Sequence, residues 1–445
     1  MTTRPKLVSS MLELIRSGNL KGFLLRAQTA EPADLGDVLA SLDDEERLEV
    51  IYALPRRLSG QALIEMPDEV QAEETLVALE PETAGEIVEE LSDDDAADLV
   101  GGLALEDQER ILSEVEDRAD VDRLLRYDAE SAGGIMTAHL VAVRNSDTAA
   151  EAIEEIRRQA EEVEDFAQVY VIDQDRRLVG VLSLKDLVTS APAREVGTFM
   201  EDADIRVAPE EDQEEVAHLM SRYNLTSIPV VDSAGRLLGR VTFDDVMNVV
   251  EAETTEDLLK FGGVSADEDL AAGWKDAVKS RLPWLLVNLA TAFLAGAVVY
   301  LFQSTISRTV ALAVWMPIIA GMGGNAGTQA LAVTVRRLAL GLIPIGRFGQ
   351  VVGKEVLVGL VNGLANGIAV AVVAYLLGQG IRLGIVVFLA MTGNLFVAGF
   401  AGALTPIVLD RLKIDPAIAS SIFVTTFTDV CGFLLLLGLA GKLLL

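Results

Sequence analysis

The sequence predicts a multi-domain protein: an all-α superhelical N-terminal domain, then an α/β tandem repeat, then an α-helical transmembrane bundle of five spans. Three observations lead to this prediction. Apolar stretches near the length of about 20 residues that spans a bilayer begin only after Arg281. Short amphipathic segments whose first helical turn is acidic recur before Tyr127. A strand, turn and strand pattern then occurs twice before the apolar stretches begin.

The charge is divided unequally between the two halves of the chain. Of the 68 acidic residues 64 precede Leu282, together with 27 of the 36 basic residues, so the first part carries a net charge of −37. Such a surface repels nucleic acid and attracts cations, which excludes nucleic acid as a partner and favours divalent cations.

Cysteine and histidine are too rare to build a redox or metal framework. The chain has one cysteine, Cys431, and two histidines, His139 and His218. This excludes a disulfide framework and a Cys/His metal site. The first 20 residues lack the continuous apolar core of a secretory signal and predict an amphipathic helix, so we expect the acidic part to stay in the cytoplasm.

Residues 1–130 are expected to form the acidic helical domain. Three segments in this range indicate a stack of short helices: LDDEERLEVIYAL from Leu42, LSDDDAADLVGGL from Leu91 and LEDQERILSEV from Leu105. Acids in a first turn are explained by capping and the helix dipole as well as by ion binding. The second segment has more acidic residues than capping of its helix requires: Asp93, Asp94, Asp95 and Asp98.

Residues 131–193 and 194–246 are interpreted as two copies of one unit. Val169–Leu187 aligns with Ile228–Val246 at an offset of 59. The matched positions are Asp173 with Asp232, Gly180 with Gly239, Ser183 with Thr242, and Asp186 with Asp245. The pattern resembles a tandem pair of CBS domains. That resemblance implies that ATP or another adenosine nucleotide would contact Ser183, Asp186, Thr242 and Asp245.

Residues 247–281 are expected to contain an acidic linking helix and a connector. Glu253, Glu256 and Asp257 are spaced at i, i+3 and i+4 and share one helix face before the Gly262–Gly263 hinge. Like charges at this spacing destabilise an isolated helix, and a bound cation would reverse the penalty. A solvated acidic face explains the same residues.

Residues 282–445 are expected to form the transmembrane domain of a multi-pass protein of the plasma (inner) membrane. The five spans lie near Pro283–Phe302, Val310–Val335, Val351–Gly378, Leu383–Leu409 and Ala417–Leu439. Lysines and arginines are concentrated before the first span, between the second and third, and between the fourth and fifth. The positive-inside rule therefore predicts a cytoplasmic N-terminus and an extracytoplasmic C-terminus.

An aspartate, Asp429, interrupts the fifth apolar stretch. A carboxylate at that depth costs about 2.5–3.5 kcal/mol on insertion scales, and the spans offer no lysine or arginine at comparable depth to pair with it. Thr425 lies one turn before it on the same face. A path for a hydrated cation such as Mg2+ explains this placement better than a protonated structural aspartate does, and a two-fold axis would double the carboxylate.

A second polar segment, Gly321–Gln329, follows Pro317 in the second span. Its glycines and the proline predict an irregular backbone, which membranes tolerate where it is buried or lines a cavity. Close helix packing is the alternative explanation for the small residues. Asn325 supplies a neutral oxygen within this segment.

The order of these parts resembles the MgtE-type magnesium channel family over essentially the whole chain. The segments MGGNAGTQ and TTFTDVCGF match that family's signature segments. The resemblance implies a homodimer with a pore between subunits and Asp429 as its central ion site. Asn325, Thr425 and Thr428 are the accompanying pore candidates.

The resemblance also implies a cytoplasmic sensor that closes the pore when Mg2+ is plentiful. The expected ligands of regulatory Mg2+ are drawn from Asp93, Asp94, Asp95, Asp98, Asp245, Glu253, Glu256, Asp257 and Asp415. Asn248 replaces a further acid common in the family, which leaves the number of regulatory ions open.

The predicted function is therefore a Mg2+-selective channel or transporter for magnesium uptake. Two alternatives stay open: an ion-coupled secondary transporter of Mg2+ or Co2+, and a membrane-tethered nucleotide sensor. Oxygen ligands leave Co2+ and Mn2+ as further transported ions. An enzyme is not expected, because no set of residues assembles a nucleophile, a base and an oxyanion site.

Overall fold

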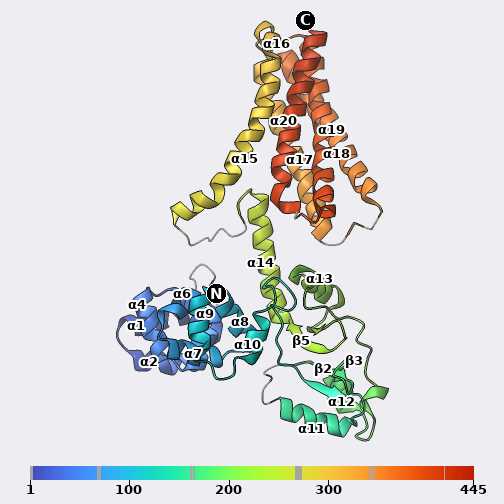
Figure 1. Ribbon diagram of the computed structural model, residues 1–445. Coiled ribbons are helices and arrows are strands. Elements are labelled where there is room, and N and C mark those ends of the chain that lie inside the picture. The colour runs from blue at the N-terminus through green and yellow to red at the C-terminus, as the bar shows by residue number, and fades with distance from the viewer. Residues whose placement is uncertain are drawn as a thin grey trace. The chain divides into compact units, whose positions relative to one another are not determined.

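The computed structural model describes residues 4–67, 72–160, 163, 166–265, 273–339, 342–343, 346–414 and 416–445. The chain divides into two compact units, Met1–Glu253 and Thr254–Leu445. Figure 1 shows both units and labels most of their elements.

The first unit begins with the predicted helical domain. Its helices are α1 (Arg4–Arg16), α2 (Leu20–Ala27), α3 (Pro32–Ala40), α4 (Asp44–Ala53), α5 (Arg56–Ile64), α6 (Ala72–Ala78), α7 (Pro81–Glu89), α8 (Asp93–Gly101), α9 (Leu105–Leu112) and α10 (Ala119–Leu124). Turn chemistry sets their starts. Asp43 caps α4 by accepting a 2.9 Å hydrogen bond from the Glu46 amide, and prolines open α3 and α7.

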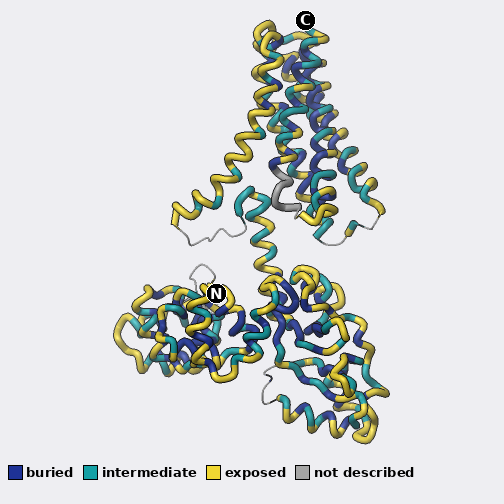
Figure 2. Tube along the Cα trace, in the orientation of Figure 1, coloured by how far each residue is buried: buried dark blue, intermediate teal, exposed yellow. Residues whose placement is uncertain are grey.

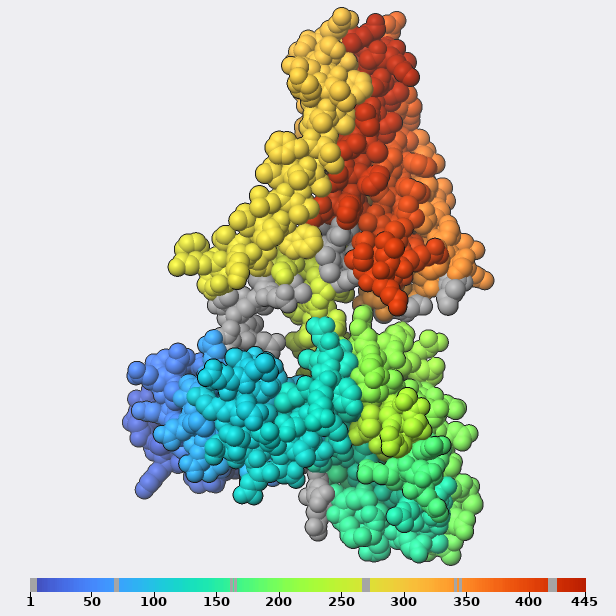
Figure 3. Space-filling model, in the orientation of Figure 1, coloured from blue at the N-terminus to red at the C-terminus, as the bar shows by residue number. Residues whose placement is uncertain are grey.

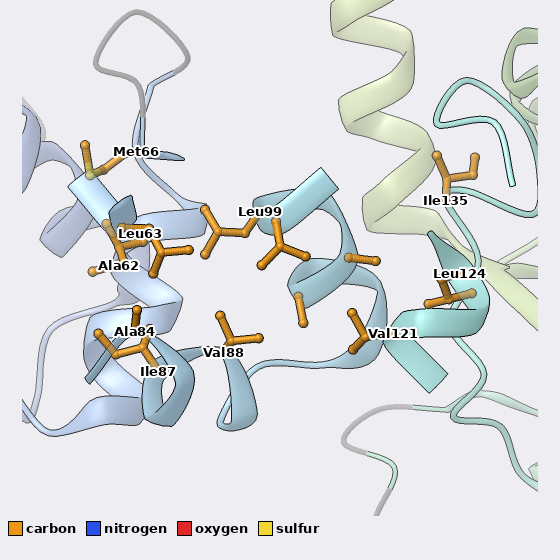
Figure 4. Packing of buried hydrophobic residues seen from close by; sticks show 14 of the residues in the cluster. Ala62, Leu63, Met66, Ala84, Ile87, Val88, Leu99, Val121, Leu124 and Ile135 are labelled. Atoms are coloured by element: carbon orange, nitrogen blue, oxygen red, sulfur yellow. The ribbon is translucent and has the colours of Figure 1, made fainter. Parts of the chain in front are cut away.

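One hydrophobic core joins this domain to the second copy of the repeat. Figure 4 shows side chains of this core from α5, α7, α8 and α10, together with Ile135. The same cluster continues to Val216, Val241 and Val249, which belong to the second copy and the helix after it. The helical domain and the second copy are therefore held by continuous apolar burial, the main favourable term in folding.

The two CBS-like copies form two small sheets. In the first, β1 (Ala142–Arg144) pairs in parallel with β2 (Gln168–Ile172), which pairs antiparallel with β3 (Leu178–Ser183). In the second, β4 (Ser227–Val231) pairs antiparallel with β5 (Leu237–Thr242). The accompanying helices are α11 (Ala149–Gln159), α12 (Leu184–Thr189) and α13 (Gln213–Tyr223), with a short 3-10 turn, η2, at Val196–Thr198.

Equivalent positions of the two copies have equivalent roles. Asp173 accepts backbone hydrogen bonds from Asp175 and Arg177, and Asp232 accepts them from Ala234 and Arg236. Both carboxylates thus close the turn between paired strands.

The glycines repeat the equivalence. A Cβ on Gly180 would lie 2.7 Å from the Glu201 carbonyl, and one on Gly239 would lie 2.6 Å from the Thr137 carbonyl. Each copy therefore needs glycine where a neighbouring backbone crosses its second strand.

The linking helix α14 (Phe243–Phe261) begins directly after β5. Val246 and Val249 are buried on its first half. The boundary between the two units falls within α14, between Glu253 and Thr254.

The second unit is a bundle of long helices. They are α15 (Trp274–Leu301), α17 (Leu312–Ala339), α18 (Phe348–Leu376), α19 (Ile381–Arg411) and α20 (Pro416–Leu443), with a short α16 (Gln303–Arg308) between the first two. Figure 2 shows α19 as the most buried of them, whereas α15 is exposed over most of its length. In Figure 3, the C-terminal part of α15 runs beside α20, and its N-terminal part diverges from the bundle towards Trp274.

Four described helices are long and apolar enough to cross a membrane: Trp274–Leu301, Phe348–Leu376, Ile381–Arg411 and Ile422–Leu443. The chain thus has a membrane region of helices, as predicted. Helix α17 has 28 residues but is outside this set, since polar residues of Gly321–Gln329 interrupt its apolar sequence.

The expectation of an irregular backbone at Gly321–Gln329 is wrong. The segment lies inside the continuous helix α17, and Pro317 falls only six positions into it. A helix satisfies the backbone groups internally, which matters most away from water, and a proline so near the start removes one hydrogen bond only. Close packing, the alternative explanation for the small residues, applies to Gly323 and Gly327, because a Cβ on either would clash with neighbouring helices.

Candidate functional site

Helices α17 and α20 pack together, and each leaves polar side chains at least partly accessible, which we call the polar strip: Thr425, Asp429, Asn325 and Gln329. Asp429 is half-buried on α20, and Thr425, one turn before it, is exposed. Asn325 and Gln329 of α17 are also exposed. An exposed polar strip on long apolar helices costs free energy if it faces lipid, so it requires water, an ion or another protein surface.

The glycines of α17 divide between two faces of that helix. A Cβ on Gly323 would lie 2.2 Å from Nδ2 of Asn394, and one on Gly327 would lie 2.4 Å from Cγ1 of Val424. A Cβ on Gly321 or Gly324 would meet nothing within 4 Å. One glycine pair therefore packs α17 into the bundle, while the other leaves the strip beside Asn325 open.

Thr428 lies on the packed face and not on the open strip. Its side chain is fully buried, and its hydroxyl donates a 3.0 Å hydrogen bond to the Thr425 carbonyl. A Cβ on Gly323 would lie 3.1 Å from its Cβ. Thr428 thus supports the contact between α17 and α20 behind Asp429.

Three carboxyl groups with raised pKa values gather in the first unit, and these we call the acid cluster: Asp94, Asp98 and Asp245. Burial raises the pKa of Asp94 to about 6, and repulsion from Asp93 and Asp95 adds to the effect. Desolvation by surrounding protein atoms raises the pKa of Asp98 to about 7, although part of its side chain reaches solvent; Asp94 and Asp95 add repulsion. Burial and the charge of Asp94 raise the pKa of Asp245 to about 7.

The acid cluster joins two elements that are far apart in the sequence. Asp94 and Asp98 stand on α8, and Asp245 stands in the first turn of α14. Oδ1 of Asp94 is buried and has no hydrogen-bond partner within the described part of the chain. Neighbouring carboxylates with an unpaired buried oxygen supply oxygen donors of the kind that a hard cation such as Mg2+ prefers.

Asp93 and Asp95 differ from the acid cluster in their contacts. Asp93 is buried and accepts hydrogen bonds from the Thr137 hydroxyl at 2.5 Å and the Ala138 amide at 2.7 Å; Nδ1 of His139 lies 3.4 Å from its Oδ1. Its oxygens are therefore engaged in docking α8. Asp95 lies beside the cluster and raises the pKa values of Asp94 and Asp98.

The acids of the linking helix have protein partners. Glu253 accepts a 2.7 Å hydrogen bond from Nε2 of Gln213, and Glu256 pairs with Lys260 one turn later. Asp257 is exposed on the same helix. Asp415, also expected as a ligand, lies outside the described residues. Within the described ranges, no three His, Cys, Asp or Glu side chains are arranged to enclose a metal.

The candidate nucleotide residues pair with one another in both CBS-like copies. Ser183 caps α12 and its hydroxyl donates to Asp186 at 2.5 Å. Thr242 donates in the same way to Asp245. Asp245 thus belongs to both the second pair and the acid cluster.

Two polar residues of the membrane region are absent from the sequence prediction. Glu355 of α18 is buried, with its Oε1 3.6 Å from an Arg337 nitrogen at the end of α17. Its carboxylate within an apolar stretch is the same signal that drew attention to Asp429. Asn394 of α19 is fully buried between helices, and a lone asparagine in an apolar stretch is too common to single it out.

Comparison with known proteins identifies the family. Residues 316–439 match the model described as a divalent cation transporter, MgtE. Residues 30–130 match the MgtE intracellular N domain, and residues 132–192 and 194–252 match CBS domains. The magnesium transporter MgtE of Thermus thermophilus is 36% identical over 446 residues, covering 99% of each chain. The chain belongs to the MgtE family.

Other MgtE proteins and structures agree with this placement. The magnesium transporter MgtE of Bacillus subtilis is 31% identical over 443 residues, 98% of this chain and 97% of that protein. The soluble part of a magnesium transporter covers 56% of this chain and 99% of its own, with a TM-score of 0.52 and 28% identity. The cytosolic domain of the Mg2+ channel MgtE in complex with ATP covers 54% of this chain and 99% of its own, with a TM-score of 0.51 and 38% identity.

Proposed function

We propose that this MgtE protein conducts Mg2+ into the cell through a path that contains Asp429, and that high cytoplasmic Mg2+ closes it. The observation that carries the proposal is the set of polar side chains that α17 and α20 leave uncovered: Thr425 and Asn325 are exposed and Asp429 is half-buried, although the neighbouring helices are apolar. Related proteins named magnesium transporters support the choice of ion.

The chemistry of the strip suits a hydrated ion. Mg2+ loses its water reluctantly and is usually held by one or two carboxylates with several waters retained. Asp429 supplies the charge, while the Thr425 hydroxyl and the Asn325 amide oxygen accept or orient the waters of the ion. The same ligands leave Co2+ and Mn2+ as further transported ions.

The full arrangement we propose is a homodimer with five spans in each subunit. Helix α17 would be the second span in chain order and would join the four apolar helices, since its polar segment would face a pore between subunits and not lipid. A two-fold axis would place two Asp429 carboxylates on one ion path. The arginines and lysines at the predicted cytoplasmic ends support an orientation with the N-terminus in the cytoplasm and the C-terminus outside, and the membrane we propose is the plasma membrane.

Closure would use the acid cluster as a Mg2+ sensor. Without cations, repulsion among Asp94, Asp98 and Asp245 opposes the docking of α8 against the start of α14. Bound Mg2+ would neutralise these carboxylates and favour the docked state, because a ligand shifts an equilibrium by its differential affinity for the two states. Glu253, Glu256 and Asp257, with Asp415, would extend the response along the linking helix.

The direct test is Mg2+ flux into liposomes that carry the purified chain, with Mg2+ titrated on the face bearing the soluble region. We expect flux that falls as this Mg2+ rises and that is lost in Asp429→Ala. The matched control is Asp410→Ala, since Asp410 is an exposed carboxylate of the same membrane region. Flux through Asp429→Ala equal to that of the unaltered chain would reject the path.

A Na+ or H+ gradient distinguishes a channel from the alternative secondary transporter. Flux of Mg2+ or Co2+ that requires either gradient would favour coupled exchange at Asp429. Flux driven by the Mg2+ gradient and the membrane potential alone supports the channel.

Nucleotide binding is the second candidate function. It is favoured by the two Ser/Thr–Asp pairs and by the relative whose cytosolic domain is described in complex with ATP. We expect ATP to bind the CBS pair and Thr242→Ala to weaken that binding, measured by calorimetry on the full chain. Saturable ATP binding with no Mg2+ flux under any condition would instead support the membrane-tethered nucleotide sensor.

A further inference from the structure

Asn394 of α19 lies at the point where three helices of the membrane region meet. Its side chain is fully buried, and Nδ2 donates a 2.9 Å hydrogen bond to the Ile319 carbonyl of α17. Its other polar atom, Oδ1, is buried without a hydrogen-bond partner among the residues that the structure describes. A half-satisfied buried amide is costly compared with an apolar side chain of similar volume. Filling space therefore does not account for an asparagine here.

The backbones of α17 and α20 both lie directly against this amide. A Cβ on Gly323 of α17 would lie 2.2 Å from Nδ2, and a Cβ on Gly432 of α20 would lie 2.8 Å from the same atom. A side chain at either glycine would displace the Asn394 amide from its buried position. The Asn394 amide thus sets how closely α17 and α20 approach α19.

These contacts flank the residues of the proposed ion path. Gly323 is two positions before Asn325, and Gly432 is three positions after Asp429, so each contact lies within one helical turn of a path residue. Asn394 touches both neighbourhoods.

We propose that Asn394 is a positioning residue for ion conduction, an inference that rests on the function proposed above. Its hydrogen bond to Ile319 and its contacts with both glycines hold α17 and α20 at the separation and rotation that place Asn325 and Asp429 on one open strip. It acts indirectly, by positioning these helices, in the way that residues hydrogen-bonded to the ligands of a metal orient those ligands.

Other asparagines of the membrane region provide a control. Asn362 of α18 is exposed, and its carbonyl accepts a 2.9 Å hydrogen bond from Nδ2 of Asn366 in the same helix. This hydrogen bond stays within one helix. Asn362→Leu therefore removes an amide of the same kind without altering the junction at Asn394.

The experiment compares Asn394→Leu, Asn394→Ser and Asn362→Leu as full chains in liposomes, with flux expressed per folded molecule. We expect Asn394→Leu to lower Mg2+ flux by about 10-fold or more and to raise the half-saturating Mg2+ concentration on the outer face. Asn394→Ser keeps a hydrogen-bond donor and should recover part of the flux. Asn362→Leu should leave both quantities unchanged, and Asn394→Leu should add no loss to Asp429→Ala.

Two results would overturn the inference. The first is that Asn394→Leu shows the same flux and half-saturating Mg2+ concentration as the unaltered chain. The second is that both Asn394 variants yield less folded protein, and the folded molecules that remain, if any, conduct normally. Either result would make Asn394 a residue of general stability. Failure of the proposed function gives a different result: no flux in the unaltered chain, or full flux in Asp429→Ala, whatever Asn394 does.

Discussion

Asp93 and Thr137 dock the helical domain onto the CBS pair through a buried hydrogen bond. The Thr137 hydroxyl donates to Oδ1 of Asp93 at 2.5 Å, and the adjacent Ala138 amide donates to Oδ2 at 2.7 Å. Because Asp93 opens α8, this bond also fixes the start of the helix that carries Asp94 and Asp98. Docking and cation binding therefore share one short segment.

Loss of the Asp93 carboxylate should loosen this docking. Asp93→Ala leaves the Thr137 hydroxyl and the Ala138 amide without their acceptor, which costs about 1–3 kcal/mol for buried groups. We expect faster amide hydrogen exchange across α8 and α10. We also expect that a higher Mg2+ concentration on the soluble side is needed to inhibit Mg2+ flux. Glu106→Ala is the control, since Glu106 is an exposed acid of a neighbouring first turn. Unchanged exchange in Asp93→Ala would contradict the docking role.

Docking of the acid cluster should depend on pH. The pKa values of Asp94, Asp98 and Asp245 are raised to about 6, 7 and 7, so the folded protein binds their protons more tightly than the unfolded chain does. Stability should therefore fall as pH rises from about 4 towards about 7 and then stay level.

Hydrogen exchange of α8 measures this dependence after correction for the intrinsic effect of pH. In the absence of Mg2+, we expect protection at pH of about 6 to exceed that at about 8, and saturating Mg2+ to remove most of the difference. The triple variant with asparagine at the three positions should lose both responses. A pH response that persists in this variant would assign it to other groups.

The two glycine faces of α17 should respond oppositely to alanine. Gly327→Ala places a Cβ 2.4 Å from Val424 Cγ1, and overpacking of this kind costs about 1–3 kcal/mol, so the melting temperature in detergent should fall. Gly324→Ala meets no atom within 4 Å and should keep the melting temperature while lowering Mg2+ flux, because the added methyl group narrows the proposed path. Full flux in Gly324→Ala would move the path away from this strip.

The ion pair between Glu355 and Arg337 should stabilise the ends of α17 and α18. Glu355→Gln leaves Arg337 without its anionic partner, and since Arg337 is about one-quarter exposed we expect a loss of about 1–3 kcal/mol. The melting temperature in detergent measures it. Arg336→Gln is the control, because Arg336 is exposed. Exchanging the two residues, so that the charges swap places, should recover part of the lost stability. A melting temperature unchanged by Glu355→Gln would show that the ion pair contributes nothing to stability.

Much of the fold follows from local patterns. Acidic first turns and helical spacing predict the short helices, and α8 begins at Asp93, two residues into the acidic segment that starts at Leu91. The offset of 59 between two aligned segments predicts two equivalent strand pairs, and Asp173 and Asp232 close equivalent turns. Length and apolarity predict the membrane helices. The one wrong prediction of local structure, an irregular Gly321–Gln329, weighed glycine propensity above the need to satisfy the backbone within the helix.

The site was predicted less completely, because a side chain's role depends on what other elements bring against it. Asp93 and Asp94 are neighbours in an acidic run, yet one docks on Thr137 and the other keeps an unpaired oxygen. Thr425 and Thr428 belong to one segment, yet the first is exposed and the second is buried against α17.

The sequence by itself determined the family, the order of the domains and the presence of a carboxylate in the last membrane helix, because motifs, repeats and composition are properties of the chain alone. Only the tertiary structure decided which glycines pack and which stay open, which acids share a cluster, and that Asn394 lies between Gly323 and Gly432. These depend on the rotation and separation of helices far apart in the sequence, which many side chains set together through close packing.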